Sequence, residues 1–298
     1  MFSIRNLTRG PAVVVACIAL AACGEGEPGP AAADKEAARA NVDAMAQQHA
    51  EDTTEPSEAT LVAPSRPVVS ERLAYAEIGD ELVHGHFAFP EDMVDPLPGL
   101  IVIHEWWGLN DNVQAMAERL AGEGYIVLAV DLYGGRTAAT PGEAQVLMRQ
   151  VVEDPESARV NIRRAFEFLQ TVGGAPSVGS LGWRFGGGWS LNAAMLLTDD
   201  LDAAVIYYGY VTDDEERLRS IEAPILGLFG AEDRGIPVDL VKRFDAALDR
   251  LGKDHTIHIY PGADHAFANP TGDNYDHAAA EDAWQKSLEF LAQKLSVE

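Results

Sequence analysis

The stretch LGWRFGGGWSL, residues 181–191, joins an apolar run to a helix-forming run through a turn bounded by glycines. Gly182 and Gly186 give the spacing Gly-x-x-x-Gly, which is typical of a β-strand that turns sharply into an α-helix. Enzymes that use this turn present a nucleophilic oxygen or sulfur at its middle position. Arg184 occupies that position, and a guanidinium is cationic at any working pH and cannot attack a substrate. The stretch therefore predicts a strand–helix unit that lacks the usual nucleophile.

On both sides of this turn, short runs rich in Val, Ile and Leu alternate with helical patterns. We predict buried strands at GLIVIHE (99–105), GYIVLAVDLY (124–133), SVGSLGW (177–183), AAVIYYG (203–209), PILGLFG (224–230) and HTIHIY (255–260). Helical patterns cover 112–123, 141–152, 155–169, 187–197, 238–251 and 275–295. ELVHGHFAFP (81–90) alternates polar and apolar residues, as a half-buried antiparallel strand does. This order predicts an α/β fold, a mostly parallel, doubly wound sheet flanked by helices.

Polar side chains follow several of these strands, at the sheet edge where sites of α/β folds collect. Glu105 follows the first buried strand, Asp233 follows PILGLFG, and His265 follows HTIHIY. The chain order of turn, Asp and His is that of an α/β-hydrolase triad, in which the aspartate would orient the imidazole and the imidazole would move protons. The alternative is that Asp233 caps a turn or the next helix and that His265 is a packed loop residue.

From about Arg72 onward the chain resembles the dienelactone hydrolase family. The resemblance rests on HEWWGLND (104–111), LAVDLYGG (128–135), GWRFGGGWSL (182–191) and YPGADHAFANP (260–270). It implies an α/β-hydrolase fold, an activity on small esters or lactones, and no cofactor. Asp233 and His265 match the family's triad acid and base, and Glu105 matches the carboxylate that contacts the resting nucleophile.

Further roles follow from the same resemblance. The backbone N–H groups of Phe185 and Trp106 match the oxyanion hole. Arg136 matches an arginine that holds the substrate's carboxylate, and Trp107 is expected to line the cleft. The second substrate arginine is absent, since Asn269 and Pro270 stand where it is expected.

The resemblance implies a nucleophilic cysteine at position 184, so Arg184 is the departure that matters. We expect its buried guanidinium to pair with Glu105.

The N-terminal residues are predicted to be an export signal. Residues 1–22 contain an apolar run too short to span a bilayer, and small residues precede Cys23. This resembles a bacterial lipoprotein signal, with Cys23 lipidated and the protein anchored in the cell envelope, at the periplasmic face of the outer membrane. Residues 23–69 are predicted to be a flexible acidic tether with a possible helix over 34–51, and residues 70–298 to be the domain.

The charge and cysteine content exclude several function classes. With 22 Lys and Arg against 47 Asp and Glu, the net charge is −25, which argues against nucleic acid as a partner. Membrane contact is expected through the lipid only. The two cysteines, Cys17 and Cys23, leave the mature domain without a thiol for a disulfide or a metal site. The histidines show no zinc-ligand spacing, so we predict no metal.

Three hypotheses follow. The first is a hydrolase in which His265, backed by Asp233, activates water while Arg184 stabilises the oxyanion. The second is a lipid-anchored pseudoenzyme that binds a small ligand without turnover. The third, a structural envelope protein, ranks behind both.

Overall fold

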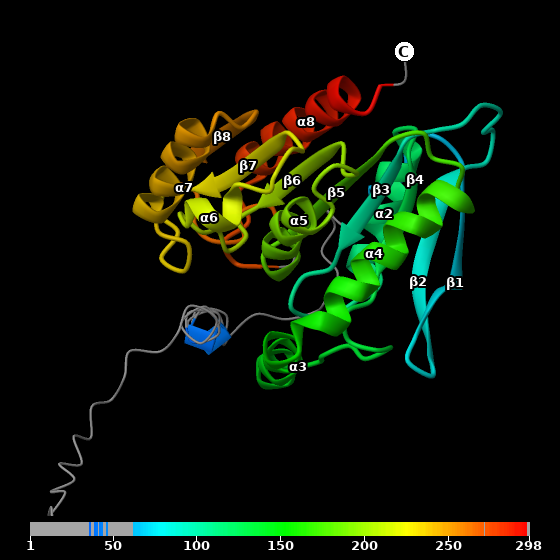
Figure 1. The fold of residues 1–298 in the computed structure, drawn as a ribbon, viewed down its shortest axis with the longest axis horizontal. Helices are drawn as coiled ribbons and strands as arrows, with labels where there is room; N and C mark the ends of the chain where they lie inside the picture. The colour runs from blue at the N-terminus through cyan, green and yellow to red at the C-terminus, as the bar shows by residue number, and fades with distance from the viewer. Residues whose placement is uncertain are drawn as a thin grey trace, which may run out of the picture.

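The computed structural model describes residues 36, 39, 40, 42, 43, 46, 62–270 and 272–296. In this part of the chain eight strands form one sheet in the order β1-β2-β4-β3-β5-β6-β7-β8 (Figure 1). The strands are β1 (Val68–Ile78), β2 (Glu81–Pro90), β3 (Gly99–Ile103), β4 (Ile126–Val130), β5 (Val178–Trp183), β6 (Ala203–Tyr207), β7 (Ile225–Gly230) and β8 (His255–Tyr260). β3 to β8 pair in parallel, while β1 and β2 form an antiparallel hairpin that joins the sheet at β4. The predicted α/β-hydrolase fold is confirmed.

The helices begin and end where local chemistry favours it. They are α2 (Asp111–Gly122), α3 (Pro141–Glu153), α4 (Pro155–Thr171), α5 (Phe185–Leu196), α6 (Glu215–Leu218), α7 (Val238–Leu251) and α8 (His277–Lys294). The side chains of Asn110, Thr140 and Asp276 cap α2, α3 and α8 by accepting backbone N–H bonds of the first turn. Gly252 ends α7 in the left-handed conformation, which glycine adopts without steric cost. All six predicted helices are present.

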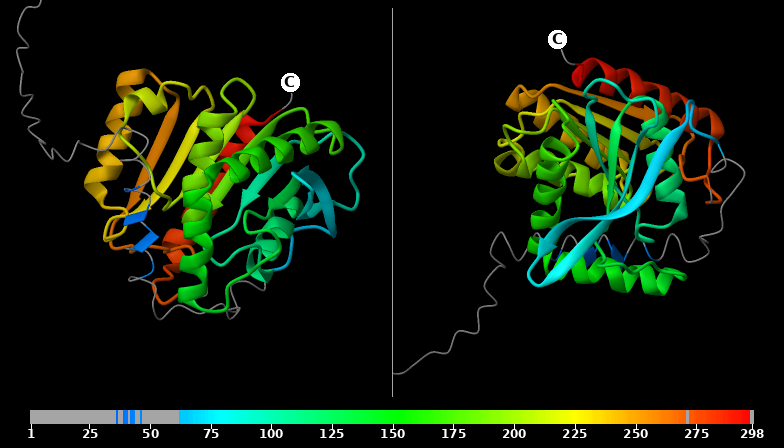
Figure 2. Two further views of the ribbon diagram at one scale, coloured as in Figure 1. Left: turned by 60° about the horizontal axis from the view of Figure 1, so that its bottom comes forward. Right: turned by 90° about the vertical axis from the view of Figure 1, so that its right-hand side faces the viewer.

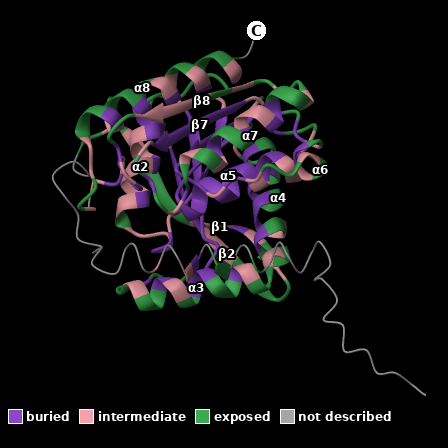
Figure 3. Ribbon diagram, turned by 90° about the vertical axis from the view of Figure 1, so that its left-hand side faces the viewer, coloured by how far each residue is buried: buried purple, intermediate pink, exposed green. Residues whose placement is uncertain are grey.

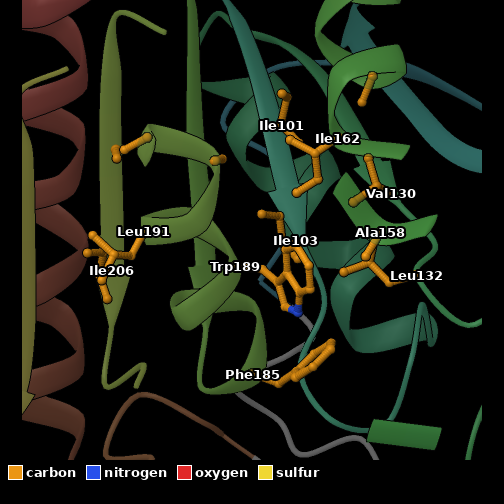
Figure 4. Packing of buried hydrophobic residues seen from close by; sticks show 14 of the residues in the cluster. Ile101, Ile103, Val130, Leu132, Ala158, Ile162, Phe185, Trp189, Leu191 and Ile206 are labelled. Atoms are coloured by element: carbon orange, nitrogen blue, oxygen red, sulfur yellow. The ribbon is translucent and has the colours of Figure 1, made fainter. Parts of the chain in front are cut away.

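The sheet separates two apolar layers (Figures 1 and 2). α2 and α8 cover one face, and α3 to α7 cover the other. Figure 3 shows the central strands buried and the outward surfaces of the helices exposed. In Figure 4, Ile101 and Ile103 of β3 lie against Ile162 of α4 and Trp189 of α5. Because β3 to β7 are buried along their whole length, their apolar runs hold the carboxyl ends of the strands in fixed positions.

Part of the predicted tether lies against the domain. Residues 36, 39, 40, 42, 43 and 46 are helical, and Arg39 and Asp43 among them contact α3. Arg39 donates to both carboxylate oxygens of Glu153, at 2.6 and 2.7 Å, and Asp43 pairs with Arg149. Val42 between them is 2% exposed. The segment is therefore held by one buried apolar side chain flanked by exposed ion pairs, which contribute little individually.

The predicted signal peptide and Cys23 lie outside the described residues. Among the residues that are described, no helix is both long enough and apolar enough to cross a bilayer.

Candidate active site

The turn after β5 holds its central residue in a strained backbone conformation. Arg184 has φ 56° and ψ −113°, values that a side chain-bearing residue adopts only when its surroundings impose them. Its N–H donates to the carbonyl of Tyr207 at 2.9 Å. A Cβ at Gly182 would lie 2.2 Å from the carbonyl oxygen of Gly186, and one at Gly186 would lie 2.1 Å from that of Ile103. These two glycines let the backbones meet closely enough to form the sharp turn.

The side chain of Arg184 is fully buried, at 0% exposure. Its guanidinium carbon lies 5.4 Å from the ring centroid of Trp106, within the range of a cation–π contact. The pKa of the neighbouring Tyr208 depends on the charges around its hydroxyl. Burial is the main cause that raises the pKa of Tyr208 well above its ordinary value; the charge of Glu105 adds to this and that of Arg184 opposes it. The cation and the carboxylate thus act on the same buried hydroxyl.

The loops after β7 and β8 bring Asp233 and His265 together. Nδ1 of His265 lies 2.6 Å from Oδ2 of Asp233, and the two side chains are 2% and 0% exposed. The other carboxylate oxygen of Asp233 accepts the N–H groups of Gly235 and Ile236, each at 2.8 Å. Asp233 therefore accepts hydrogen bonds from the backbone of its own turn and also contacts the imidazole. The role in capping a turn and the role in orienting His265 are thus compatible. With Nδ1 so engaged, the opposite ring nitrogen is the one placed for proton transfer.

Replacing Asp233 tests how much this network contributes to folding. In Asp233→Ala, two N–H groups and the imidazole lose a buried acceptor, and we expect the free energy of unfolding in urea to fall by about 2–3 kcal/mol. The matched control is Asp273, which is exposed. Asp273→Ala should change the free energy of unfolding by less than about 0.5 kcal/mol. Equal losses in the two variants would contradict this role.

Tyr208 completes the surroundings of the imidazole. Its ring lies 5.6 Å from that of His265 and 5.3 Å from that of Phe267. Its φ is 36°, and that of Ala266 is 60°. Together with Arg184 these are the described non-glycine residues with positive φ, and all three lie at this site. Strain concentrated in this way is typical of functional sites.

His104 is a structural neighbour of the site. One ring nitrogen lies 2.6 Å from the carbonyl oxygen of Glu105, and the other accepts the N–H of Leu132 at 3.1 Å. Burial lowers the pKa of His104, in agreement with a neutral ring that donates once and accepts once. Both nitrogens are thus used within the fold. Among the described residues, no group of three or more His, Cys, Asp or Glu side chains could hold a metal ion.

The predicted oxyanion donors are the N–H groups of Phe185, directly after Arg184, and of Trp106, in the loop after β3. Phe185 is the first residue of α5, so its N–H belongs to the first turn, where helical geometry supplies no acceptor. Trp106 directly follows Glu105 at the end of β3 and is buried. Helix N-termini and such loops suit developing negative charge, and the role of these two groups as an oxyanion hole stays a prediction.

The predicted substrate contacts are not all at one place. Trp107 lines a pocket with Glu105 and Asn269, beside the turn. Arg136 instead lines a second hollow, against the β1–β2 hairpin. Its guanidinium donates to the carbonyl of Tyr133 at 3.1 Å and to Gln150 at 2.6 Å. Arg136 is thus among the residues that line this second hollow and not among those that line the pocket with Glu105.

Comparison with known proteins identifies the family of the chain. The family model described as "Dienelactone hydrolase family" matches residues 83–295. The chain belongs to the dienelactone hydrolase family. A candidate carboxymethylenebutenolidase of Saccharolobus solfataricus is 31% identical over 246 residues, which cover 70% of this chain and 93% of that protein. A candidate carboxymethylenebutenolidase of Escherichia coli K12 is 31% identical over 254 residues, covering 80% and 92%.

Solved structures of dienelactone hydrolases and dienelactone hydrolase-like proteins match about three quarters of the chain. The crystal structure of a candidate dienelactone hydrolase from Klebsiella pneumoniae is 27% identical, with a TM-score of 0.69, and covers 76% of this chain and 100% of that one. A dienelactone hydrolase-like promiscuous phosphotriesterase from metagenomic libraries is 23% identical, with a TM-score of 0.70, and covers 77% and 99%. The second likeness is one of fold alone.

Proposed function

We propose that this dienelactone hydrolase family member hydrolyses small carboxylic esters or lactones without forming an acyl-enzyme at residue 184. The observation that supports this most is the buried Asp233–His265 pair, retained beside a turn that has lost its nucleophile. A buried imidazole held by a carboxylate is poised to act as a general base. The likeness to proteins assigned as carboxymethylenebutenolidases suggests the substrate class.

The reaction proceeds by attack of water. His265 takes a proton from the water molecule while the water oxygen bonds to the carbonyl carbon of the substrate. Negative charge develops on the carbonyl oxygen, where the Arg184 guanidinium and the N–H groups of Phe185 and Trp106 stabilise it. The C–O bond to the leaving group then breaks, and the leaving oxygen takes the proton from His265. The products are one carboxylic acid and one alcohol, or a hydroxy acid from a lactone.

The burial of Arg184 favours a second candidate function. A guanidinium with no exposed surface blocks the position from which a nucleophile would attack a bound ester. In that case the protein binds a small ester-like ligand without turnover. The two functions differ in whether unaltered protein hydrolyses an ester in a way that depends on His265.

The discriminating experiment is hydrolysis of p-nitrophenyl acetate by the purified protein and two histidine variants. We expect His265→Ala to lower kcat/KM at least about tenfold, because the general base is removed. His277→Ala is the matched control, since this exposed histidine lies at the start of α8, and it should leave kcat/KM unchanged. A rate that is the same in all three proteins contradicts the proposed hydrolysis and leaves the binding function.

A further inference from the structure

Two hollows on the α2 and α8 face of the sheet share one wall. The first has a volume of about 40 Å³ and begins at Glu105, and the second has a volume of about 50 Å³ and reaches Arg119 and Trp284. Both are lined by Met116, Trp183, Ala268 and Pro270. Because they share these residues, the two hollows lie side by side, and together they are here called the α2–α8 groove.

One end of the groove lies at the candidate active site. Glu105, which lines it, directly precedes Trp106, whose ring centroid lies 5.4 Å from the guanidinium carbon of Arg184. Trp183, which lines both halves, directly precedes Arg184 at the end of β5. A substrate whose carbonyl lies at Arg184 would therefore have this groove as an adjacent space for one of its substituents.

The floor of the groove is apolar and held in place. Trp183 is 5% exposed, and its ring packs 5.7 Å from that of Tyr207. The Tyr207 hydroxyl lies 3.0 Å from the carbonyl oxygen of Ala283 and 2.7 Å from Ser287, so α8 is fixed against β6. Preformed pockets with apolar walls suit apolar ligand groups, since little ordering is needed on binding.

At the far end of the groove, the lining residues Arg119 and Trp284 form a cation–π contact. The guanidinium carbon of Arg119 lies 3.9 Å from the ring centroid of Trp284. Glu281 also lines this end, which offsets the charge of Arg119. A strongly acidic protein with a net charge of −25 does not favour an extended anion here. Between the polar ends, the shared lining of Met116, Trp183, Ala268 and Pro270 fits an uncharged apolar chain or ring.

We propose that the α2–α8 groove binds the apolar group of the substrate, and that the preferred substrates are esters with an extended acyl chain or an aryl group. The placement of the ester carbonyl at Arg184 rests on the proposed function. Binding of an apolar group in the groove does not rest on it, because binding requires no hydrolysis.

The test uses 2-octanone, an uncharged ketone that resembles an ester and is not hydrolysed. Met116→Trp places a larger side chain in both halves of the groove, and we expect it to weaken binding of 2-octanone by the purified protein at least about tenfold, measured by calorimetry. The same variant should lower the ratio of rates on p-nitrophenyl octanoate and p-nitrophenyl acetate to a similar extent. Met195→Trp is the matched control, because Met195 is also half-buried on a helix but lies on α5, outside the groove.

The outcomes separate the two proposals. Loss of 2-octanone binding in Met116→Trp alone supports the groove, even where no protein hydrolyses an ester and the proposed function fails. Binding that is unchanged in Met116→Trp, or weakened equally by Met195→Trp, overturns the groove. If Met116→Trp does not fold, Ala268→Leu narrows the groove from its opposite wall, and its result has the same meaning.

Discussion

Arg184→Cys is expected to raise kcat/KM for p-nitrophenyl acetate about 100-fold or more over the unaltered protein. The turn holds residue 184 in the strained conformation that presents a nucleophile, and His265 is already oriented by Asp233 at 2.6 Å. An imidazole beside a thiol favours the thiolate, which is the attacking species. The measurement is steady-state hydrolysis together with a burst of p-nitrophenolate, whose size equals the enzyme concentration if an acyl-enzyme forms.

Two controls isolate the thiol. Arg184→Ala removes the cation without supplying a nucleophile and should show no burst. The double variant with His265→Ala keeps the thiol but loses its base, so the gain should fall at least about tenfold. An Arg184→Cys protein that folds, carries a thiol that iodoacetamide alkylates, and still shows no burst would mean that the turn no longer presents residue 184 to a substrate.

Gly186→Ala is expected to lower the free energy of unfolding by about 4 kcal/mol or more, which is among the largest effects of single substitutions. The added methyl carbon would lie 2.1 Å from the carbonyl oxygen of Ile103 and 2.6 Å from that of His104. Both are backbone atoms of the β3 end, so relief requires a shift of the central strand. Urea denaturation followed by tryptophan fluorescence gives the value.

Gly142→Ala is the matched control. Gly142 lies in α3, and a Cβ there meets no atom within 4 Å. Alanine favours the helical conformation over glycine, so this variant should gain up to about 1 kcal/mol. A Gly186→Ala protein as stable as Gly142→Ala would show that the β3 end moves easily.

The parallel sheet could be predicted from the sequence because most of its strands are short apolar runs bounded by turn residues. β3 to β7 are buried on both faces, and no polar residue interrupts Gly99–Ile103 or Ile225–Gly230. β1 was missed because it lies at the edge, where most of VVSERLAYAEI faces solvent and carries no pattern. α6 has four residues, fewer than the helical repeat needs to be recognised.

The position of the candidate site was predictable, and its internal arrangement was not. The order of Glu105, Arg184, Asp233 and His265 along the chain places them at one sheet edge, because parallel strands end there together. Which pocket Arg136 faces depends on its contact with Gln150 of α3, which no local pattern encodes.

Some residues of interest gave no signal in the sequence. Met116 and Arg119 line the α2–α8 groove, yet they read as ordinary positions of an amphipathic helix. The docking of Val42 was missed for a related reason, since its segment is poor in large apolar residues and a single buried valine does not mark an interface. Contacts between segments distant in sequence decide both.

The strain at Arg184 has a consequence for how such a protein changes over generations. Gly182, Gly186 and the neighbouring carbonyls impose the turn, and the residue at its centre only occupies it. The side chain at position 184 is therefore not needed to form the turn. A new side chain can be introduced there, and selected for a different chemistry, while the scaffold that aims it is inherited unchanged.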